Sequence, residues 1–354
     1  MLLTMSRLAW VAAAAGHVWS YSLKLRLSPR RAFALFLDCV WSGARPNEAL
    51  IWRQLFPKSG RHPLPGRAAA RLLSQIGNPD GHILLFDKQA TGDFLASHGL
   101  RVPETRGLIR ANSGRDIVLS LDQPLWSLPA QLFVKPRHGS AARNAVAIDV
   151  LGPDAYRIDG NAPCQFPFLR DHIATKLQDD LLVQTRLQAA TSISDLAFNS
   201  AAPVLRLTAA RYPGERPFLH SALLSIAVPN ENPRNFLRGH MWVPIDAKTG
   251  AMAHAIWFAD PDKIYSKLPW NGAALSGRCL PGLGDAVKMA MQATTLLPAL
   301  ALVNWDLILT EDGPVFLEGN TSGNWILTNL SATVPGLETT ALAPLLAKWI
   351  GSPC

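Results

Sequence analysis

Near its C-terminal end the chain reads Asn304-Trp305-Asp306-Leu307-Ile308-Leu309-Thr310-Glu311-Asp312-Gly313-Pro314-Val315-Phe316-Leu317-Glu318-Gly319-Asn320-Thr321. Two runs of strand-forming residues flank a turn at 311–314, and this pattern predicts a β-hairpin. We expect Glu311 and Asp312 to be solvated carboxylates of that turn. The rest of the hairpin carries the candidate chemistry.

Side chains alternate between the two faces of a strand. Asp306 should therefore share a face with Asn304, and Glu318 should share one with Phe316 and Asn320. If the strands pair around the turn, two carboxylates and an amide converge on one surface. Such oxygen donors suit Mg²⁺, a hard cation that binds a few protein oxygens together with substrate phosphates. The alternative is an ordinary acidic surface hairpin, because short motifs often occur without function.

The order Asp306, then Glu318-Gly319-Asn320, resembles the metal-binding end of the ATP-grasp superfamily. The flanking residues look most like its sugar-transfer-associated branch, which is related to the α-L-glutamate ligases. The resemblance covers about residues 80–345 and implies an α+β fold in which two lobes clasp ATP. It also implies that Asp306 and Glu318 hold Mg²⁺ and that Asn320 takes part in a second metal site.

A strand, a loop of small residues and a second strand follow one another at 132–136, 137–145 and 146–150. Backbone N–H groups of such a loop can fold over phosphates, and a cation at the strand end can neutralise phosphate charge. The resemblance assigns phosphate contacts to Lys135 and to the loop residues Gly139 and Ser140. This loop has one glycine where relatives often have more.

The stretch 87–105 predicts a helix that Asp87 caps and Gly99 ends. It resembles the segment that leads into an ATP-grasp nucleotide lobe, where Lys88 would reach a phosphate. An exposed helix lysine is the alternative. The strand 181–187 then resembles the linker between the lobes, so that Gln184 and Leu187 would line the adenine pocket.

An arginine, Arg206, stands in the alternating strand Val204-Leu205-Arg206-Leu207-Thr208. Burying a guanidinium is costly unless it meets an anion. We therefore interpret Arg206 as a contact to phosphate or to a substrate carboxylate, with a structural ion pair as the alternative.

The composition fits a globular enzyme. The chain has 354 residues, 48% hydrophobic and 17% charged, which argues against disorder. A net charge of +8 allows nucleic acid, an anionic membrane surface or phosphorylated substrates as partners, and no motif indicates nucleic acid. The four scattered cysteines form no C-x-x-C pair and indicate free thiols in a reducing cytoplasm.

The N-terminal region, residues 1–75, should be helical. Its apolar run 8–15 could imitate a signal peptide, but the glycine, histidine and tryptophan that follow favour a helix. The basic residues after this run could rest on the inner membrane surface, with a solvated basic face as the alternative; they are Lys24, Arg26, Arg30 and Arg31.

The sequence thus predicts a cytoplasmic, ATP- and Mg²⁺-dependent carboxylate–amine ligase. Residues 76–187 would hold the nucleotide lobe and residues 188–354 the metal and substrate lobe, with Lys135 and Arg206 as catalytic cations. The name of the branch suggests cell-surface polysaccharide synthesis. A phosphotransferase and a nucleotide-binding protein without catalysis are the alternatives, because a fold does not fix a reaction.

Overall fold

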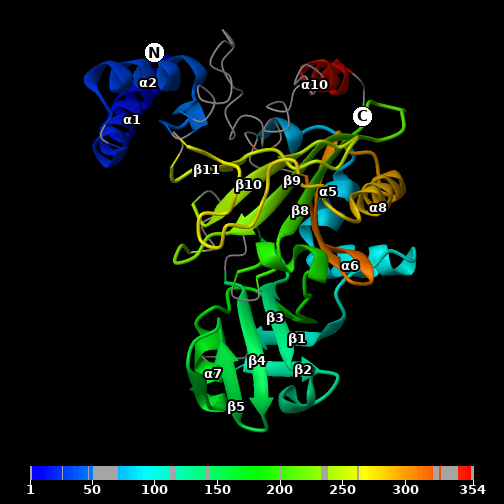
Figure 1. Cartoon of the computed structure of the whole chain (residues 1–354). Helices are drawn as coiled ribbons and strands as arrows, with labels where there is room; N and C mark the ends of the chain where they lie inside the picture. The colour runs from blue at the N-terminus through cyan, green and yellow to red at the C-terminus, as the bar shows by residue number, and fades with distance from the viewer. Residues whose placement is uncertain are drawn as a thin grey trace.

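The chain has a mixed α+β fold built on two antiparallel sheets, as the computed structural model shows (Figure 1). The structure describes residues 2–25, 27–46, 48–50, 71–111, 117–139, 144–198, 201–232, 238–260, 263–321, 327 and 342–351. The α+β class predicted from the sequence is confirmed.

The first sheet consists of β1 (Thr105–Ala111), β2 (Ile117–Leu121), β3 (Gln131–Pro136), β4 (Val146–Gly152), β5 (Ala155–Ile158), β6 (Pro163–Cys164) and β7 (Leu181–Thr185). Their spatial order is β2-β1-β7-β3-β4-β5-β6. A short 3₁₀ helix, Leu125–Ser127, precedes β3. The predicted strand–loop–strand unit is therefore present as β3 and β4.

Alternation gives this sheet one apolar face and one mixed face. Leu132 and Val134 of β3 are buried in a core that helix α7 (Phe166–Ala174) completes. Lys135, which pairs in register with Leu182, lies on the opposite face together with Gln184, the partner of Phe133. The face with Lys135 and Gln184 is thus the one that α7 does not cover.

The second sheet consists of β8 (Val204–Ala210), β9 (Phe218–Ala227), β10 (His240–Ile245), β11 (Ala255–Trp257), β12 (Ile264–Tyr265), β13 (Leu302–Thr310) and β14 (Gly313–Asn320). Their order is β12-β11-β10-β9-β8-β13-β14. A 3₁₀ helix, Thr191–Leu196, lies between the last strand of the first sheet and β8. All strands of the second sheet follow those of the first in the chain, which crosses from one sheet to the other after β7.

Three helices cover the apolar face of the second sheet, namely α5 (Pro79–Phe86), α6 (Lys88–Ser97) and α8 (Leu283–Leu296) (Figure 1). Small residues of α8, spaced four and three apart, are fully buried: Ala286, Ala290 and Ala293. They let the helix approach Leu205, Leu207 and Trp305 closely. The result is the largest apolar core of the described residues.

The other face of the second sheet carries a polar row. Arg206 of β8 lies opposite Asp306 of β13, and Thr208 lies opposite Asn304. Asp306 in turn lies opposite Glu318 of β14. Directly paired residues on neighbouring strands project on the same side of a sheet. The topology therefore gathers the candidate metal ligands on one surface.

The predicted hairpin is confirmed, and one detail of its faces is wrong. β13 and β14 pair around Glu311 and Asp312, but the register shifts after Asp306, so that Leu307 pairs with Phe316. This bulge places Phe316 on the apolar face, where its ring packs 4.9 Å from that of Trp305. Phe316 does not share a face with Glu318, because an extra residue in one strand reverses the alternation beyond it.

The N-terminal region forms two helices, α1 (Leu2–Leu25) and α2 (Pro29–Ser42). Ser28 accepts a hydrogen bond from the backbone N–H of Arg31 and caps α2, and Gly43 in the left-handed conformation ends it. The helical prediction holds for this part, whereas residues 51–70 lie outside the described ranges. None of the described helices is both long and apolar enough to cross a bilayer.

The last described element is helix α10 (Leu342–Gly351). Its side chains Leu345 and Leu346 pack against Leu73 and Leu302, which joins α10 to the start of β13.

Candidate active site

Lys135 connects the two sheets. It ends β3, it is buried, and its Nζ donates a hydrogen bond to the carbonyl oxygen of Leu317 on β14 at 3.0 Å. Burial lowers the pKa of Lys135 to about 8; the carboxylate of Glu318 opposes this change, and the nearby Lys88 adds to it. A buried ammonium group beside a carboxylate is suited to receive an anionic ligand.

Lys88 reaches the same place from helix α6. Its Nζ donates to the carbonyl oxygen of Gly139 at 2.6 Å and lies 3.9 Å from Oε2 of Glu318. The alternative of a freely exposed helix lysine is therefore wrong, because the side chain is largely buried against these groups. Two lysines from different elements thus flank one glutamate.

Hydrogen bonds of the preceding residue, Asp87, hold Lys88 in position. The carboxylate of Asp87 caps α6 by accepting from the N–H groups of Gln89 and Ala90. It also accepts hydrogen bonds from Nε of Arg137, at 3.0 Å to each oxygen, and from Nη2 at 2.6 Å. These bonds lower the pKa of Asp87 to about 2. The start of α6 is thereby fixed to the end of β3, next to the loop.

The loop after β3 is anchored at its base. The N–H of Arg137 donates to the carbonyl of Asp180, and the N–H of His138 donates to Asp179. Gly139 follows with a φ of +104°, a conformation that residues with a Cβ atom rarely adopt. Ser140, predicted to bind phosphate, lies outside the described residues, so its role stays a prediction.

Arg206 forms a bidentate ion pair with Asp306. Nε and Nη2 donate to the two carboxylate oxygens at 2.7 and 2.6 Å, and both side chains are buried. Burial alone would lower the pKa of Arg206, but Asp306 outweighs burial and raises it. The guanidinium also lies 5.7 Å from the ring of Trp242. The structure therefore contains the ion pair that the sequence left as an alternative; a contact to phosphate or substrate stays a prediction.

The predicted metal ligands lie side by side. Asn320 donates to Glu318 Oε1 at 3.1 Å, and the hydroxyl of Thr208 donates to the side-chain oxygen Oδ1 of Asn304 at 2.8 Å. The side-chain nitrogen Nδ2 of Asn304 is buried and has no hydrogen-bond partner among the described residues. Two carboxylates and an amide on adjacent strands fit the oxygen preference of Mg²⁺. Asp306 would have to share its carboxylate with Arg206, whereas Glu318 is the more accessible ligand.

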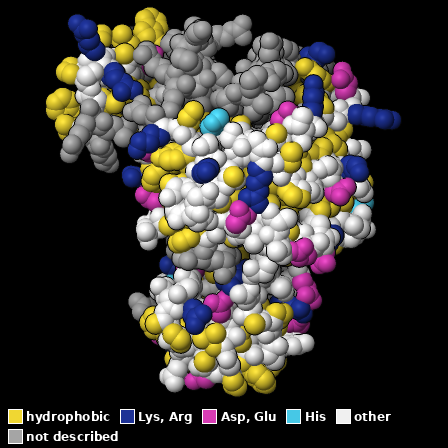
Figure 2. All heavy atoms as spheres, viewed as in Figure 1, with side chains coloured by type: hydrophobic (Ala, Val, Ile, Leu, Met, Phe, Trp, Pro, Cys, Tyr) yellow, Lys and Arg dark blue, Asp and Glu magenta, His cyan; other side chains and the backbone are white. Residues whose placement is uncertain are grey.

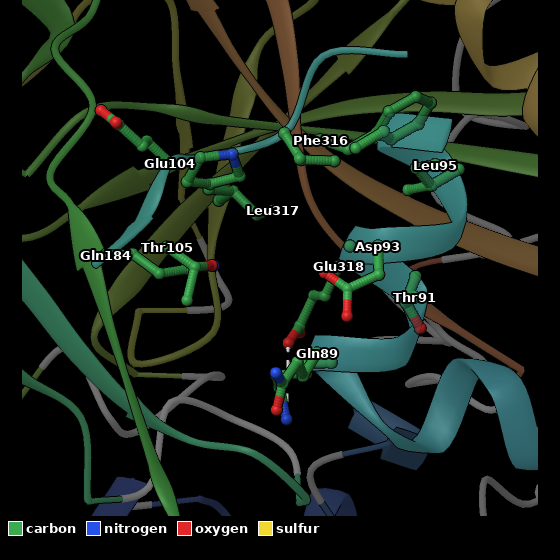
Figure 3. Close-up of a pocket in the computed structure, with 15 residues that line it drawn as sticks. Gln89, Thr91, Asp93, Leu95, Glu104, Thr105, Gln184, Phe316, Leu317 and Glu318 are labelled. Atoms are coloured by element: carbon green, nitrogen blue, oxygen red, sulfur yellow. Dashed lines mark hydrogen bonds and ion pairs between the residues drawn. The ribbon is translucent and has the colours of Figure 1, made fainter. Parts of the chain in front are cut away.

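A cavity of about 300 Å³ opens beside this group (Figure 3). Lys88 and Glu318 line it, and Gln184 and Thr105 form the wall on the first sheet. Gln184 donates its side-chain amide to Thr105 at 3.1 Å, which fixes its orientation. Leu187 lies beyond the end of β7 at Thr185 and is not among the residues that line this cavity. Its contact with adenine stays a prediction.

Glu311 is not merely a solvated turn residue, as the sequence suggested. It is exposed, but its carboxylate accepts a hydrogen bond from the backbone N–H of Thr191 at the start of a 3₁₀ helix. The side chain and the backbone of Thr191 lower the pKa of Glu311. Asp312 is exposed as expected and lies near Arg101. Glu311 therefore makes a structural contact.

Sequence reasoning missed Gly319, which lies between two predicted metal ligands on the apolar face. A Cβ atom there would lie 2.6 Å from Cζ3 of Trp305 and 2.9 Å from Cδ2 of Leu85. Trp305 cannot easily yield, since it is buried and its Nε1 donates to Thr294. The bulky Trp305 in the paired strand was the only sequence signal for this requirement.

The mixed α+β fold with two antiparallel sheets is that of an ATP-grasp protein. A family model described as sugar-transfer associated ATP-grasp matches residues 67–339, and the chain belongs to this family. The resemblance carried by the hairpin is thus confirmed. No curated protein matches the chain.

Three solved structures are similar to this chain. The D-alanine–D-alanine ligase from Coxiella burnetii has 12% identity and a TM-score of 0.46, over 80% of this chain and 63% of that one. The D-alanine–D-alanine ligase from Bacillus anthracis complexed with ATP has 12% identity and a TM-score of 0.45, over 77% and 68%. N5-carboxyaminoimidazole ribonucleotide synthetase from Thermotoga maritima has 11% identity and a TM-score of 0.37, over 72% and 48%. The chain thus spans between about half and two thirds of their lengths.

Proposed function

We propose that this chain is an ATP- and Mg²⁺-dependent ligase that activates a carboxylate for attack by an amine or a related nucleophile. The observation that supports the proposal is the meeting of three cations with two carboxylates beside one cavity. The cations are Lys88, Lys135 and Arg206, and the carboxylates are Asp306 and Glu318. Clustered positive charge suits a triphosphate, and the adjacent carboxylates suit its divalent metal.

In this proposal each group has a separate role. Lys88 and Lys135 bind phosphate oxygens, and Gly139 and Ser140 of the loop after β3 would contact them as well. Gln184 lies at the wall where a base would be placed. Asp306, Glu318 and Asn320 would hold Mg²⁺, which neutralises triphosphate charge when bound.

The proposed reaction has two steps. An oxygen of the substrate carboxylate attacks the γ-phosphorus of ATP, the bond from that phosphorus to ADP breaks, and an acyl phosphate forms. The amine then attacks the acyl carbon, and inorganic phosphate leaves. Lys135 and Arg206 contribute by positioning the reacting groups and spreading the charge that develops on phosphoryl oxygens.

The setting is part of the same proposal. The family description, sugar-transfer associated, supports a role in cell-surface polysaccharide synthesis. The scattered cysteines support a place in the cytoplasm. The basic residues that follow the apolar run 8–15 support a peripheral contact with the inner membrane surface. Of these, Arg30 and Arg31 are exposed, whereas Arg26 and the side chain of Lys24 lie outside the described residues.

The test is Mg²⁺-dependent ADP release, screened over amino acids and sugar acids as carboxylate substrates. Glu318→Gln keeps the shape of the side chain and removes its charge, so activity should fall by roughly 100-fold or more. Glu215→Gln is the matched control, because Glu215 is exposed in the turn between β8 and β9. Glu311 is unsuitable, since it bonds the backbone of Thr191.

Calorimetry with a non-hydrolysable ATP analogue in the absence of metal should give binding for both variants. Binding should be weaker for Glu215→Gln, because in that variant both carboxylates of the site still face the triphosphate. Equal activity of Glu318→Gln and Glu215→Gln would contradict the proposed site. A stable phosphorylated product that forms without an amine would identify a phosphotransferase instead. Nucleotide binding without any ADP release across the screen would identify a binding protein.

A further inference from the structure

The two N-terminal helices carry apolar side chains on both sides. Their inner sides pack together through Ala14 and Val18 of α1 and through Leu35 and Cys39 of α2. Their outer sides also carry large apolar residues, which are exposed. A helix that is apolar all round is normally covered on every side, so the outer surface calls for a second partner.

The exposed residues are ordered by helix geometry. In α2, Phe33 follows Arg30 by three residues, and Leu37 and Trp41 follow at intervals of four. These four residues therefore lie on one stripe. Trp41 is 79% exposed, and Phe33 is also largely exposed. In α1, Trp19 is 70% exposed, and Leu23 lies one turn further on. Figure 2 shows hydrophobic side chains beside Lys and Arg at this end of the molecule.

The same segment concentrates positive charge. Residues 1–42 contain five basic residues, Arg7, Lys24, Arg26, Arg30 and Arg31, against one acidic residue, Asp38. Five minus one leaves +4, which is half of the net charge of +8 of the whole chain. The exposed stripe of α2 begins with Arg30 and contains no acidic residue.

We propose that the outer surface of α1 and α2 inserts into the interface of an anionic lipid bilayer, with the helices lying along the surface. Tryptophan and phenylalanine are stable at the headgroup level, and arginines there meet lipid phosphates. This goes beyond a purely electrostatic contact, because the apolar side chains enter the bilayer. It does not depend on the ligase activity.

The net positive charge of residues 1–42 argues against two other partners for this surface, a second copy of the chain and an apolar protein. A second copy of the chain would bring the same +4 against this segment, and like charges oppose association. An apolar protein partner would satisfy the stripe but not the excess of arginine and lysine. In Figure 1 the helices lie at the end of the molecule away from β5 and α7, so membrane binding leaves the first sheet in solution.

The experiment is flotation of the full chain with vesicles of phosphatidylcholine alone and of an equimolar mixture with phosphatidylglycerol. The parent should float with the anionic vesicles at about 0.1 M salt and in part at about 1 M salt, where surface charge is screened. Phe33→Ser with Trp41→Ser should reduce the bound fraction roughly tenfold, because both side chains lose their apolar insertion. Arg30→Gln with Arg31→Gln should reduce binding to anionic vesicles about fivefold per residue and should leave binding to phosphatidylcholine vesicles unchanged.

The matched control is Trp126→Ser. Trp126 is 53% exposed, lies in the first sheet's lobe and should not affect flotation. Circular dichroism checks that each variant is folded. The proposal fails if the parent binds neither vesicle, or if Trp126→Ser weakens binding as much as the α2 variants. It also fails if the α2 apolar variants bind like the parent and high salt abolishes all binding, which would indicate charge alone. A dimer that these variants abolish, without vesicle binding, would show that a second copy covers the surface.

Discussion

Replacing Arg206 by methionine tests the ion pair at the centre of the candidate site. Methionine keeps much of the length of the side chain and removes its charge. The side chains of Arg206 and Asp306 are only 10% and 8% exposed, and two hydrogen bonds of 2.7 and 2.6 Å join them. In the variant the carboxylate of Asp306 stays buried and loses both bonds.

The expected loss follows from this geometry. Two unit charges about 4 Å apart interact by about 4 kcal/mol at the effective dielectric constant of about 20 found near protein sites. Removal of one partner of a buried pair leaves the other charge desolvated and costs about 3–5 kcal/mol. A domain's whole free energy of unfolding is about 5–15 kcal/mol, so Arg206→Met should be severely destabilised.

The double variant Arg206→Met with Asp306→Leu distinguishes the cost of an unpaired buried charge from the cost of the other contacts that are lost. It buries no charge, so its free energy of unfolding should return to within about 2 kcal/mol of the parent. The remaining loss includes the contact between Arg206 and Trp242, worth about 0.5–2 kcal/mol. The coupling between the two positions should then be about 2 kcal/mol or more.

The assay is urea unfolding, followed by both tryptophan fluorescence and far-ultraviolet circular dichroism, so that coincident transitions support a two-state treatment. Two results would refute the reasoning. One is a loss below about 1 kcal/mol for Arg206→Met. The other is a double variant no more stable than the single one, since the pair would then not be the source of the loss.

Two further predictions concern the same site. Burial lowers the pKa of Lys135 from 10.5 to about 8, so kcat/KM for ATP should fall as pH rises through about 8, and Lys135→Arg should remove that fall. The folded chain releases this proton at a lower pH than the unfolded chain does. The free energy of unfolding of the parent should therefore rise relative to that of Lys135→Met between about pH 8 and 10.5. Urea unfolding measures this, and a difference between parent and variant that does not change with pH would contradict it. Gly319→Ala should cost about 1–3 kcal/mol in thermal or urea melts, because its Cβ would meet Trp305. Gly284→Ala, in α8 with open space around the new Cβ, is its control and should be neutral or stabilising.

Local signals in the sequence predicted the elements that carry the site. The turn at 311–314 and the flanking alternation gave the hairpin. The pairing of Asp306 with Glu318 depends on the bulge, because the register that starts with Thr310 opposite Gly313 would otherwise place Leu317 opposite Asp306. The strand that ends at Lys135 was equally local. The position of Phe316 could not be predicted, because a bulge in one strand depends on how its partner packs and not on the alternating pattern.

Long-range contacts were beyond sequence reasoning for a physical reason. Arg206 and Asp306 are 100 residues apart, and they meet because β8 lies next to β13 although several strands intervene in the chain. Lys135 and the carbonyl of Leu317 are 182 residues apart and join different sheets. Strand order is decided by the packing of whole layers, so a lone arginine in an apolar strand could indicate an anion nearby without identifying it.

The charges of the site indicate how it would take up its ligands. Three cations, Lys88, Lys135 and Arg206, stand against two carboxylates, and each carboxylate already lies beside a cation. A divalent metal that binds without the nucleotide would be repelled by the three cations. A triphosphate that binds without the metal would be repelled by the two carboxylates. If both arrive as one complex, the carboxylates can turn to the metal while the cations turn to the phosphates, so every lost pair is replaced by another. In the proposed function, magnesium and nucleotide would therefore bind together. Loss of the Glu318 charge would then weaken the binding of the metal and strengthen the binding of nucleotide without metal.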